Sequence, residues 1–276
     1  KRLALSKKKV KKFYKGENAK VLLNLITERA IELQYRSNLI LDFILKDLEK
    51  ENIFIVDEQA IPKDSISFIE SFFLDKIQPK LKIVLLNEKD DFPQLSESSC
   101  FLIVKVESKN ENLNYAIIQF PDEFERFIVI KNQDVKYVIM IDDIIRYHLF
   151  EIFKIFNPLN ISANMIKFSR DAELDFDDDI SKSYLEKISQ SVKDRLKGDP
   201  LRFVYDKEID PNTLKFLLEK MNINSEIDSV IPGGKYHNKK DYMNFPILNN
   251  ELAYEKIEQL VIKDFYKHKT VFESID

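Results

Sequence analysis

Residues 200–246 constrain the fold more than any other stretch of the chain. They join an apolar run at Leu201–Tyr205, a helical pattern that begins at Pro211, a second apolar run at Ser229–Ile231, and a Gly-Gly turn followed by a basic aromatic segment. Proline suits the first turn of a helix because its missing N–H has no hydrogen bond to make there. The order therefore predicts a strand–helix–strand unit that ends in a charged turn.

Hairpins are expected earlier in the chain. The apolar runs Cys100–Val106 and Tyr115–Phe120 are separated by the polar residues 109–114, and two further runs follow at Phe127–Lys131 and Lys136–Met140. Hairpins together with a crossover favour an α+β fold over a doubly wound sheet. Further strands are expected at Ile53–Val56 and Ile161–Phe168, and further helices at 62–77 (ending before Pro79), 141–156 and 180–197.

Residues 18–50 have the pattern of one long helix. Their apolar side chains recur at steps of three, four or seven and therefore share one face. The pattern is long for a helix of a globular domain, so it indicates either a break near residues 36–38 or a helix of a bundle. The residues of this stripe are Leu23, Ile26, Ala30, Leu33, Ile40, Ile44 and Leu48.

Composition excludes several classes of protein. The single cysteine, Cys100, rules out an internal disulfide framework, and four Gly with no Trp argue against an all-β sandwich. No apolar run approaches the ~20 residues that a membrane span needs. We therefore expect a soluble, cytoplasmic protein without a membrane span.

Charge is distributed unevenly along the chain. Residues 1–16 carry eight Lys or Arg and no acid, so the remainder has 35 basic against 47 acidic residues. A basic arm on an acidic body is typical of a protein with a polyanionic partner, but also of a solvated terminus. The sequence leaves both interpretations open.

The segment Gly233–Lys240, GGKYHNKK, has the most suggestive local chemistry. Two glycines permit a positive φ and open backbone N–H groups, and three lysines with an imidazole add charge nearby. It is not a P-loop, because the pattern GxxxxGK[ST] is absent. The segment predicts either phosphate contact or domain docking, or else a tight turn that displays surface lysines before a short helix at 238–245.

Three arginines lie in or beside the expected strands. Arg170 and Arg202 can each form a structural ion pair or bind phosphate through the planar guanidinium, whereas Arg126 is expected to be structural. The acidic run 171–179 follows Arg170 and predicts capping of a helix N-terminus. A divalent-metal site is the alternative, although the run lacks the Gly and the bidentate Glu of a calcium loop.

No catalytic constellation is recognisable. His148, His237 and His268 form no metal-ligand spacing, and no GxSxG pattern or activated cysteine occurs. His148 falls on an apolar helical stripe and is expected to be hydrogen-bonded and partly buried. We expect no catalytic residue, cofactor site or metal site in this chain.

Three segments resemble a known enzyme family. MIKFSRDAELD at 165–175, DEFERFIVI at 122–130 and the stretch 200–246 are similar, in order and spacing, to polyphosphate kinase of the first type. The likeness runs from about Arg29 to the end of the chain. It implies an enzyme that transfers the terminal phosphoryl group of ATP to polyphosphate through a phosphohistidine, with Mg²⁺. It also implies that the accepting histidine and the nucleotide-binding arginines lie in domains beyond a point matching Asp276, and that a helical pair precedes Lys1.

The resemblance further implies how this chain is organised. Residues 1–52 would end an N-terminal helical domain, 53–248 would form a mixed α/β head domain, and 249–276 would connect to the catalytic domains. The head domain would be a scaffold within a homo-oligomer and would guide the polyanion, while ATP and Mg²⁺ would bind mainly elsewhere. The candidate polyphosphate contacts are Lys167, Arg170, Arg202, Lys235 and Lys239.

Two other functions stay open. One is a stand-alone module that binds polyanions or nucleic acid through residues 1–15 and 235–240, although no RNP1 strand or zinc-finger spacing indicates a specific nucleic acid. The other is a protein-interaction module whose long helix binds a partner.

Overall fold

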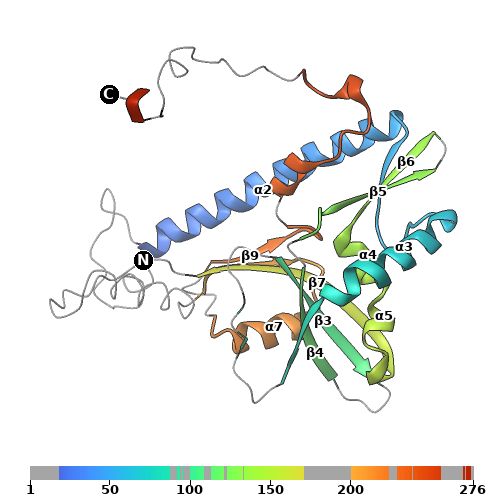
Figure 1. Ribbon diagram of the computed structural model, residues 1–276. Coiled ribbons are helices and arrows are strands. Elements are labelled where there is room, and N and C mark those ends of the chain that lie inside the picture. Colours follow the sequence, from blue (N-terminus) through green and yellow to red (C-terminus); the bar gives the residue numbers. More distant parts are fainter. Residues whose placement is uncertain are drawn as a thin grey trace. The chain divides into compact units, whose positions relative to one another are not determined.

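The computed structural model describes most of the chain (Figure 1). The chain divides into two compact units, Lys1–Phe245 and Pro246–Asp276. The basic arm, the acidic run 171–179, the helix expected at 180–197 and His268 lie outside the described residues. The described residues are 19–87, 92–93, 95, 100–108, 113–120, 123–132, 134–170, 200–223, 229–237, 239–255, 270 and 272–274.

Six strands of the first unit form a mixed sheet in the order β2-β4-β3-β7-β8-β9. β8 and β9 are parallel and are joined through helix α7, and every other neighbouring pair is antiparallel. The expected crossover and the expected β3–β4 hairpin are therefore both present, and the fold is α+β. The strands are β2 (Lys82–Leu86), β3 (Cys100–Ser108), β4 (Leu113–Gln119), β7 (Pro158–Arg170), β8 (Pro200–Asp206) and β9 (Ser229–Gly233).

Three strands form a smaller sheet in the order β1-β6-β5. β5 and β6 are an antiparallel hairpin, and β1 lies parallel to β6. All three lie where the sequence predicts strands. Their bounds are β1 (Ile53–Val56), β5 (Phe127–Asn132) and β6 (Val135–Met140).

Helices and short helical turns complete the structure. Helix α7 begins as its sequence predicts, with Pro211 in its first turn and the Asp210 carboxylate accepting a hydrogen bond from the backbone N–H of Thr213 at 3.0 Å. The helices are α2 (Ala19–Lys50), α3 (Ile66–Phe72), α4 (Ile141–Tyr147), α5 (Leu149–Ile152) and α7 (Pro211–Lys220). The shorter turns are η2 (Lys63–Ser65), η3 (Phe73–Ile77, a π turn), η4 (Gln78–Lys80), η5 (Lys154–Phe156), η6 (Lys239–Asn244), η7 (Asn250–Leu252) and η9 (Phe272–Ser274).

Both faces of the large sheet bury side chains. On β3, Leu102 and Val104 belong to a core with residues of α3, α4 and α5, whereas Phe101 and Ile103 belong to a second core with Leu217 of α7. Successive residues of a strand point to opposite faces, so a strand covered on both sides needs apolar residues throughout. This explains why Cys100–Val106 is a continuous apolar run.

Two expected helices differ from the structure. The segment that begins after Pro62 passes from η2 through α3 and η3 into η4, and Pro79 does not end it, because Pro79 lies in the first turn of η4, where no N–H is needed. The stripe at 141–156 is divided into α4, α5 and η5. His148 ends α4 and begins α5 with a backbone (φ −96°, ψ 9°) outside the regular α-helical region.

Helix α2 is continuous through residues 36–38, so the break, one of the two alternatives left open by the sequence, is absent (Figure 1). The apolar stripe is only partly buried: Leu23 is 8% exposed, whereas Leu33 and Ile40 are 52% and 61% exposed. The helix contacts β1 and β9, and Ser37, which lies four residues after Leu33 and three before Ile40 on the stripe, accepts a hydrogen bond from Lys239. Among the described residues, no helix is both long and apolar enough to cross a membrane.

Candidate functional site: a cationic cleft beside the Gly-Gly turn

A cleft of about 550 Å³ lies between α2, the paired strands β7 and β8, and the segment that follows β9. Every charged side chain among the described residues that line it is a cation. No carboxylate of the described part of the chain lines it, although acids outnumber bases in the sequence. The lining residues are Gln34, Ser37, Lys167, Phe168, Ser169, Arg202, Val204, Tyr236, His237, Lys239 and Lys240.

The register of β7 and β8 places two of the cations on one face of the sheet. Lys167 lies opposite Val204, and Ser169 lies opposite Arg202. Opposed residues of an antiparallel pair share a face, as do residues two apart in a strand. These four side chains therefore form one patch, while Phe203 between them points into the core on the other face.

Lys239 lies on the opposite side of the cleft and is held by neutral groups. Its Nζ donates hydrogen bonds to Ser37 Oγ at 2.9 Å and to Asn38 Oδ1 at 2.5 Å, both on α2. Burial lowers the pKa of Lys239, and the attraction of Asp42 one turn along only partly opposes this. Within the described parts of the chain no carboxylate forms an ion pair with Lys239, so its charge is available to an anion in the cleft.

Lys235, in contrast, forms ion pairs with three acidic side chains and does not line the cleft. Its Nζ lies 2.5 Å from a Glu58 carboxylate oxygen, 3.1 Å from Asp57 and 3.5 Å from Asp143. Burial alone would lower the pKa of Lys235, but the attraction of Asp143 and Glu58 outweighs it and raises the pKa. The sequence suggested Lys235 as an anion contact, and its geometry argues for a structural ion pair instead.

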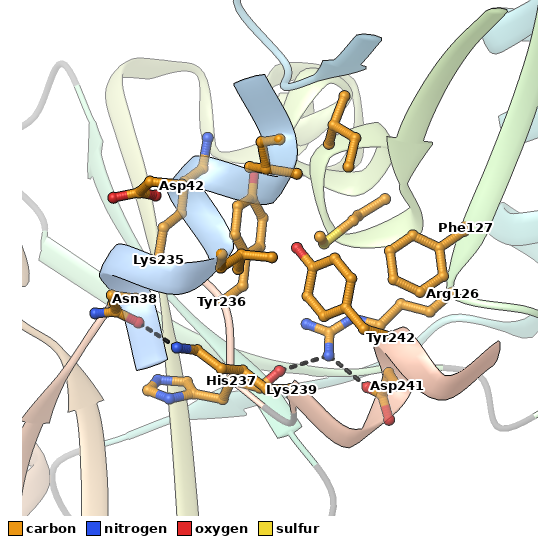
Figure 2. A pocket seen from close by; sticks show the side chains of 15 residues that line it. Asn38, Asp42, Arg126, Phe127, Lys235, Tyr236, His237, Lys239, Asp241 and Tyr242 are labelled. Atoms are coloured by element: carbon orange, nitrogen blue, oxygen red, sulfur yellow. Dashed lines mark hydrogen bonds and ion pairs between the residues drawn. The ribbon is translucent and has the colours of Figure 1, made fainter. Parts of the chain in front are cut away.

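Arg126 anchors the segment behind the cleft (Figure 2). Its guanidinium donates to Asp142 Oδ2 at 2.5 Å, to Asp241 Oδ2 at 2.5 Å and to the carbonyl oxygen of His237 at 2.6 Å. Burial opposes the charge of Arg126, yet these acids outweigh it and raise its pKa. The structural role expected for Arg126 is thus observed. The group borders a second, smaller cavity of about 250 Å³ beneath α2.

Of the two glycines of the turn, Gly233 matters because it lacks a side chain, not because of its backbone φ. Neither Gly233 nor Gly234 has a φ between +20° and +160°, so the backbone freedom that glycine permits is not used here. A Cβ on Gly233 would lie 2.6 Å from Cε1 of His237 and 3.2 Å from Nε2 of Gln34, whereas a Cβ on Gly234 would meet nothing within 4 Å. Gly233 is therefore required for the close approach of β9, the His237 ring and α2.

The described histidines do not add charge to the cleft. His237 is buried, its Nε2 lies 3.1 Å from the Met165 carbonyl oxygen, and burial lowers its pKa, so it is neutral near pH 7. The expectation that this imidazole adds charge is wrong for that reason. His148 is buried and hydrogen-bonded to the Ile144 carbonyl oxygen at 2.8 Å, as its place on an apolar stripe indicated.

Sequence and structure agree only in part on the cleft. The structure brings together Lys167, Arg202 and Lys239 from the expected set and adds Lys240 and the α2 wall. Arg170 ends β7 next to this patch, and the structure describes its backbone only. No group of three or more His, Cys, Asp or Glu side chains suited to a metal ion occurs in the described ranges.

Comparison with known proteins identifies relatives of this arrangement. Residues 64–245 match the family pattern "Polyphosphate kinase middle domain". The polyphosphate kinase of Vibrio parahaemolyticus is 32% identical over an alignment of 267 residues that covers 94% of this chain and 38% of that protein. The polyphosphate kinase of Salmonella typhimurium is 31% identical over an alignment of 237 residues that covers 84% of this chain and 34% of that protein.

A solved structure supports the fold independently. The crystal structure of polyphosphate kinase from Porphyromonas gingivalis superposes with a TM-score of 0.68 and 24% identity, covering 93% of this chain and 37% of that one. This chain thus spans somewhat over a third of the length of the relatives that it matches. Because the family pattern covers most of its length, the chain belongs to the polyphosphate kinase family and contains that family's middle domain.

Proposed function

We propose that this chain is the middle part of an enzyme that transfers the γ-phosphoryl group of ATP to polyphosphate through a phosphohistidine. In this proposal the chain is a scaffold within a homo-oligomer, and the cationic cleft guides the polyphosphate. ATP and Mg²⁺ bind mainly to other parts of the enzyme. The family assignment and the names of the relatives support this role.

The observation that carries the polyphosphate contact is the one-sided charge of the cleft. Four cations and no described carboxylate line it, whereas the neighbouring Lys235 is neutralised by three acids. Each unit of polyphosphate carries a negative charge. A row of cations can therefore bind successive units, and no other recognition group is needed. Lysine supplies point charges, and the guanidinium of Arg202 can bind two oxygens of one phosphate.

The described histidines favour a scaffold role for this chain over a catalytic one. His148 and His237 are both buried, and each has a ring nitrogen hydrogen-bonded to a backbone carbonyl group. A histidine that accepts a phosphoryl group needs an exposed nitrogen in line with the donor. We therefore place the phosphohistidine in another part of the enzyme.

Charge reversal tests the contact. Arg202 and Lys240 are exposed, and no ion pair of theirs occurs in the described structure, so Arg202→Glu with Lys240→Glu should not disturb folding. Lys131→Glu with Lys154→Glu makes the same change of net charge on exposed residues of β5 and η5. Polyphosphate affinity at low salt should fall at least about tenfold in the cleft variant only.

Salt dependence and competition complete the test. The slope of log affinity against log salt should flatten by roughly one for each contact removed, because fewer counterions are released. An equal loss in the control variant, or none in the cleft variant, argues against the cleft. Stronger binding of single-stranded nucleic acid than of polyphosphate would favour the alternative of a nucleic-acid module.

A further inference from the structure

Lys239 lies at the boundary between two cavities. Its side chain lines both the cationic cleft and the smaller cavity of about 250 Å³ beneath α2. Ser37 lines the cleft, whereas Asn38 and Asp42 line the smaller cavity. The direction in which the Lys239 ammonium group points therefore decides which of the two cavities receives its charge.

Two neutral side chains hold the ammonium group where it is observed. Ser37 Oγ accepts a hydrogen bond from Lys239 Nζ at 2.9 Å, and Asn38 Oδ1 accepts one at 2.5 Å (Figure 2). Ser37 and Asn38 are half-buried residues of α2, and the helical backbone fixes the directions of their side chains. A lysine side chain is long and flexible, so it keeps one direction only where partners of this kind restrain it.

Asp42 is a competing partner for the same ammonium group. It lies one turn after Asn38, so the two side chains share a face of α2. Within the described ranges the Asp42 carboxylate forms no hydrogen bond or ion pair, yet its negative charge attracts Lys239. A rotation of the Lys239 side chain away from Asn38 would let it form an ion pair with Asp42, like the pairs that Lys235 forms with its acids.

An ion pair with Asp42 would remove one cation from the cleft. Lys167 and Arg202 lie on the wall formed by β7 and β8, and Lys239 lies on the opposite side. The cleft would keep Lys167, Arg202 and Lys240, but the side opposite the sheet would lose the charge of Lys239. Polyphosphate would then be bound less tightly, because each phosphate contact adds to the affinity.

We propose that Ser37 and Asn38 are positioning residues that hold the Lys239 ammonium group toward the cleft and away from Asp42. This inference rests on the proposed function of the cleft. Helix α2 then contributes to anion binding although its residues that line the cleft, Gln34 and Ser37, carry no charge. Neutral acceptors suit this role, because they restrain the ammonium group without cancelling its charge, as a carboxylate would.

A double-mutant cycle tests the positioning role. Ser37→Ala with Asn38→Ala removes both acceptors and leaves every cation in place, and alanine is well suited to the helix. Polyphosphate affinity at low salt should fall about fivefold, and its salt slope should flatten by roughly one, as for the loss of one phosphate contact. Asp42→Asn should raise the affinity by less than about twofold in the wild type but by about fivefold in the alanine variant, because only there does Asp42 hold Lys239.

A ligand-free measurement separates the possible failures. ¹³C NMR of the lysine Cε groups of the full chain, assigned with Lys239→Gln, reports the pKa of Lys239. Asp42→Asn should lower this pKa more in the alanine variant than in the wild type, because an ion pair stabilises the charged lysine. An unchanged affinity of the alanine variant, or equal effects of Asp42→Asn in the two backgrounds, overturns the positioning role. A merely structural loss would not be reversed by Asp42→Asn. Absence of polyphosphate binding by the wild-type chain overturns the proposed function of the cleft, whatever the lysine titration shows.

Discussion

The ammonium group of Lys239 lies 2.9 Å from the hydroxyl oxygen of Ser37, a residue 202 positions earlier in the chain. This hydrogen bond joins the segment after the Gly-Gly turn to α2 and closes one side of the cleft. The cleft is therefore assembled from four separate parts of the sequence, and its integrity depends on how closely α2 approaches β9.

That approach makes Gly233 sensitive to the addition of a single methyl group. Gly233→Ala should destabilise the fold by about 1–3 kcal/mol, because the added Cβ collides with the His237 ring and with Gln34. Urea unfolding measures this difference. Gly234→Ala is the matched control and should change stability by less than about 0.5 kcal/mol, since its Cβ meets open space. Equal effects of the two substitutions would contradict the packing described for this turn.

Arg126 should matter for stability more than any cation of the cleft. Arg126→Gln removes the partner of the fully buried Asp142 and should cost about 3–5 kcal/mol, as breaking a buried ion pair does. Arg202→Gln, on an exposed side chain, should change stability by less than about 0.5 kcal/mol. Chemical denaturation of the two variants checks this order, and a cost for Arg202→Gln as large as that for Arg126→Gln would refute it.

Asp143 should give the fold a distinctive pH dependence. Its pKa rises from 3.8 to about 7 on folding, so the folded state holds a proton that the unfolded state releases. The contribution of Asp143 to stability is then greatest below about pH 4 and is lost as pH rises to about 7. Relative to the wild type, Asp143→Asn should gain stability across this window. Denaturation midpoints measured along the window test the sign, and a relative loss with rising pH would mean that Asp143 is ionised when folded.

His148 should give the folding stability the opposite pH dependence, with stability lost as pH falls. It is stacked on Phe73 with ring centroids 3.9 Å apart, and its Nε2 is buried with no hydrogen-bond partner in the described structure. Burial lowers the pKa of His148 from 6.5, so stability is lost as pH falls below about 6.5, where the unfolded state takes up a proton first. His148→Phe keeps the stacked ring and removes the titrating group. The melting temperature of this variant should therefore decrease less than that of the wild type as pH falls below about 6.5. An unchanged acid limb would show that His148 does not titrate in this range.

Much of the fold could be predicted from local pattern. Ile53–Val56 was predicted to the residue, and the strands at 100–106, 127–131 and 201–205 to within two residues, because apolar runs between polar turns leave few other arrangements. β2 was not predicted, since it lies at the edge of the sheet and four of its five residues are exposed. The division of 141–156 depends on the backbone at His148, for which the apolar stripe gives no signal.

The cleft could be predicted only in part, because the partners of a charged side chain come from distant segments that only the folded structure brings together. Lys235 and Lys239 look alike in GGKYHNKK, yet Lys235 meets three acids from distant segments and Lys239 meets neutral groups of α2. No local signal places Ser37 beside Lys239, because the two residues are 202 positions apart in the chain.

The central claim is that polyphosphate occupies the cationic cleft, and lysine footprinting tests it most directly. The chain is acetylated with and without polyphosphate, and the modification of each lysine is measured by mass spectrometry. Lys239 and Lys240 should be protected by polyphosphate, whereas Lys131 and Lys154, exposed on other elements, should react equally in both samples. Equal reactivity of Lys239 and Lys240 with and without bound polyphosphate would contradict the account.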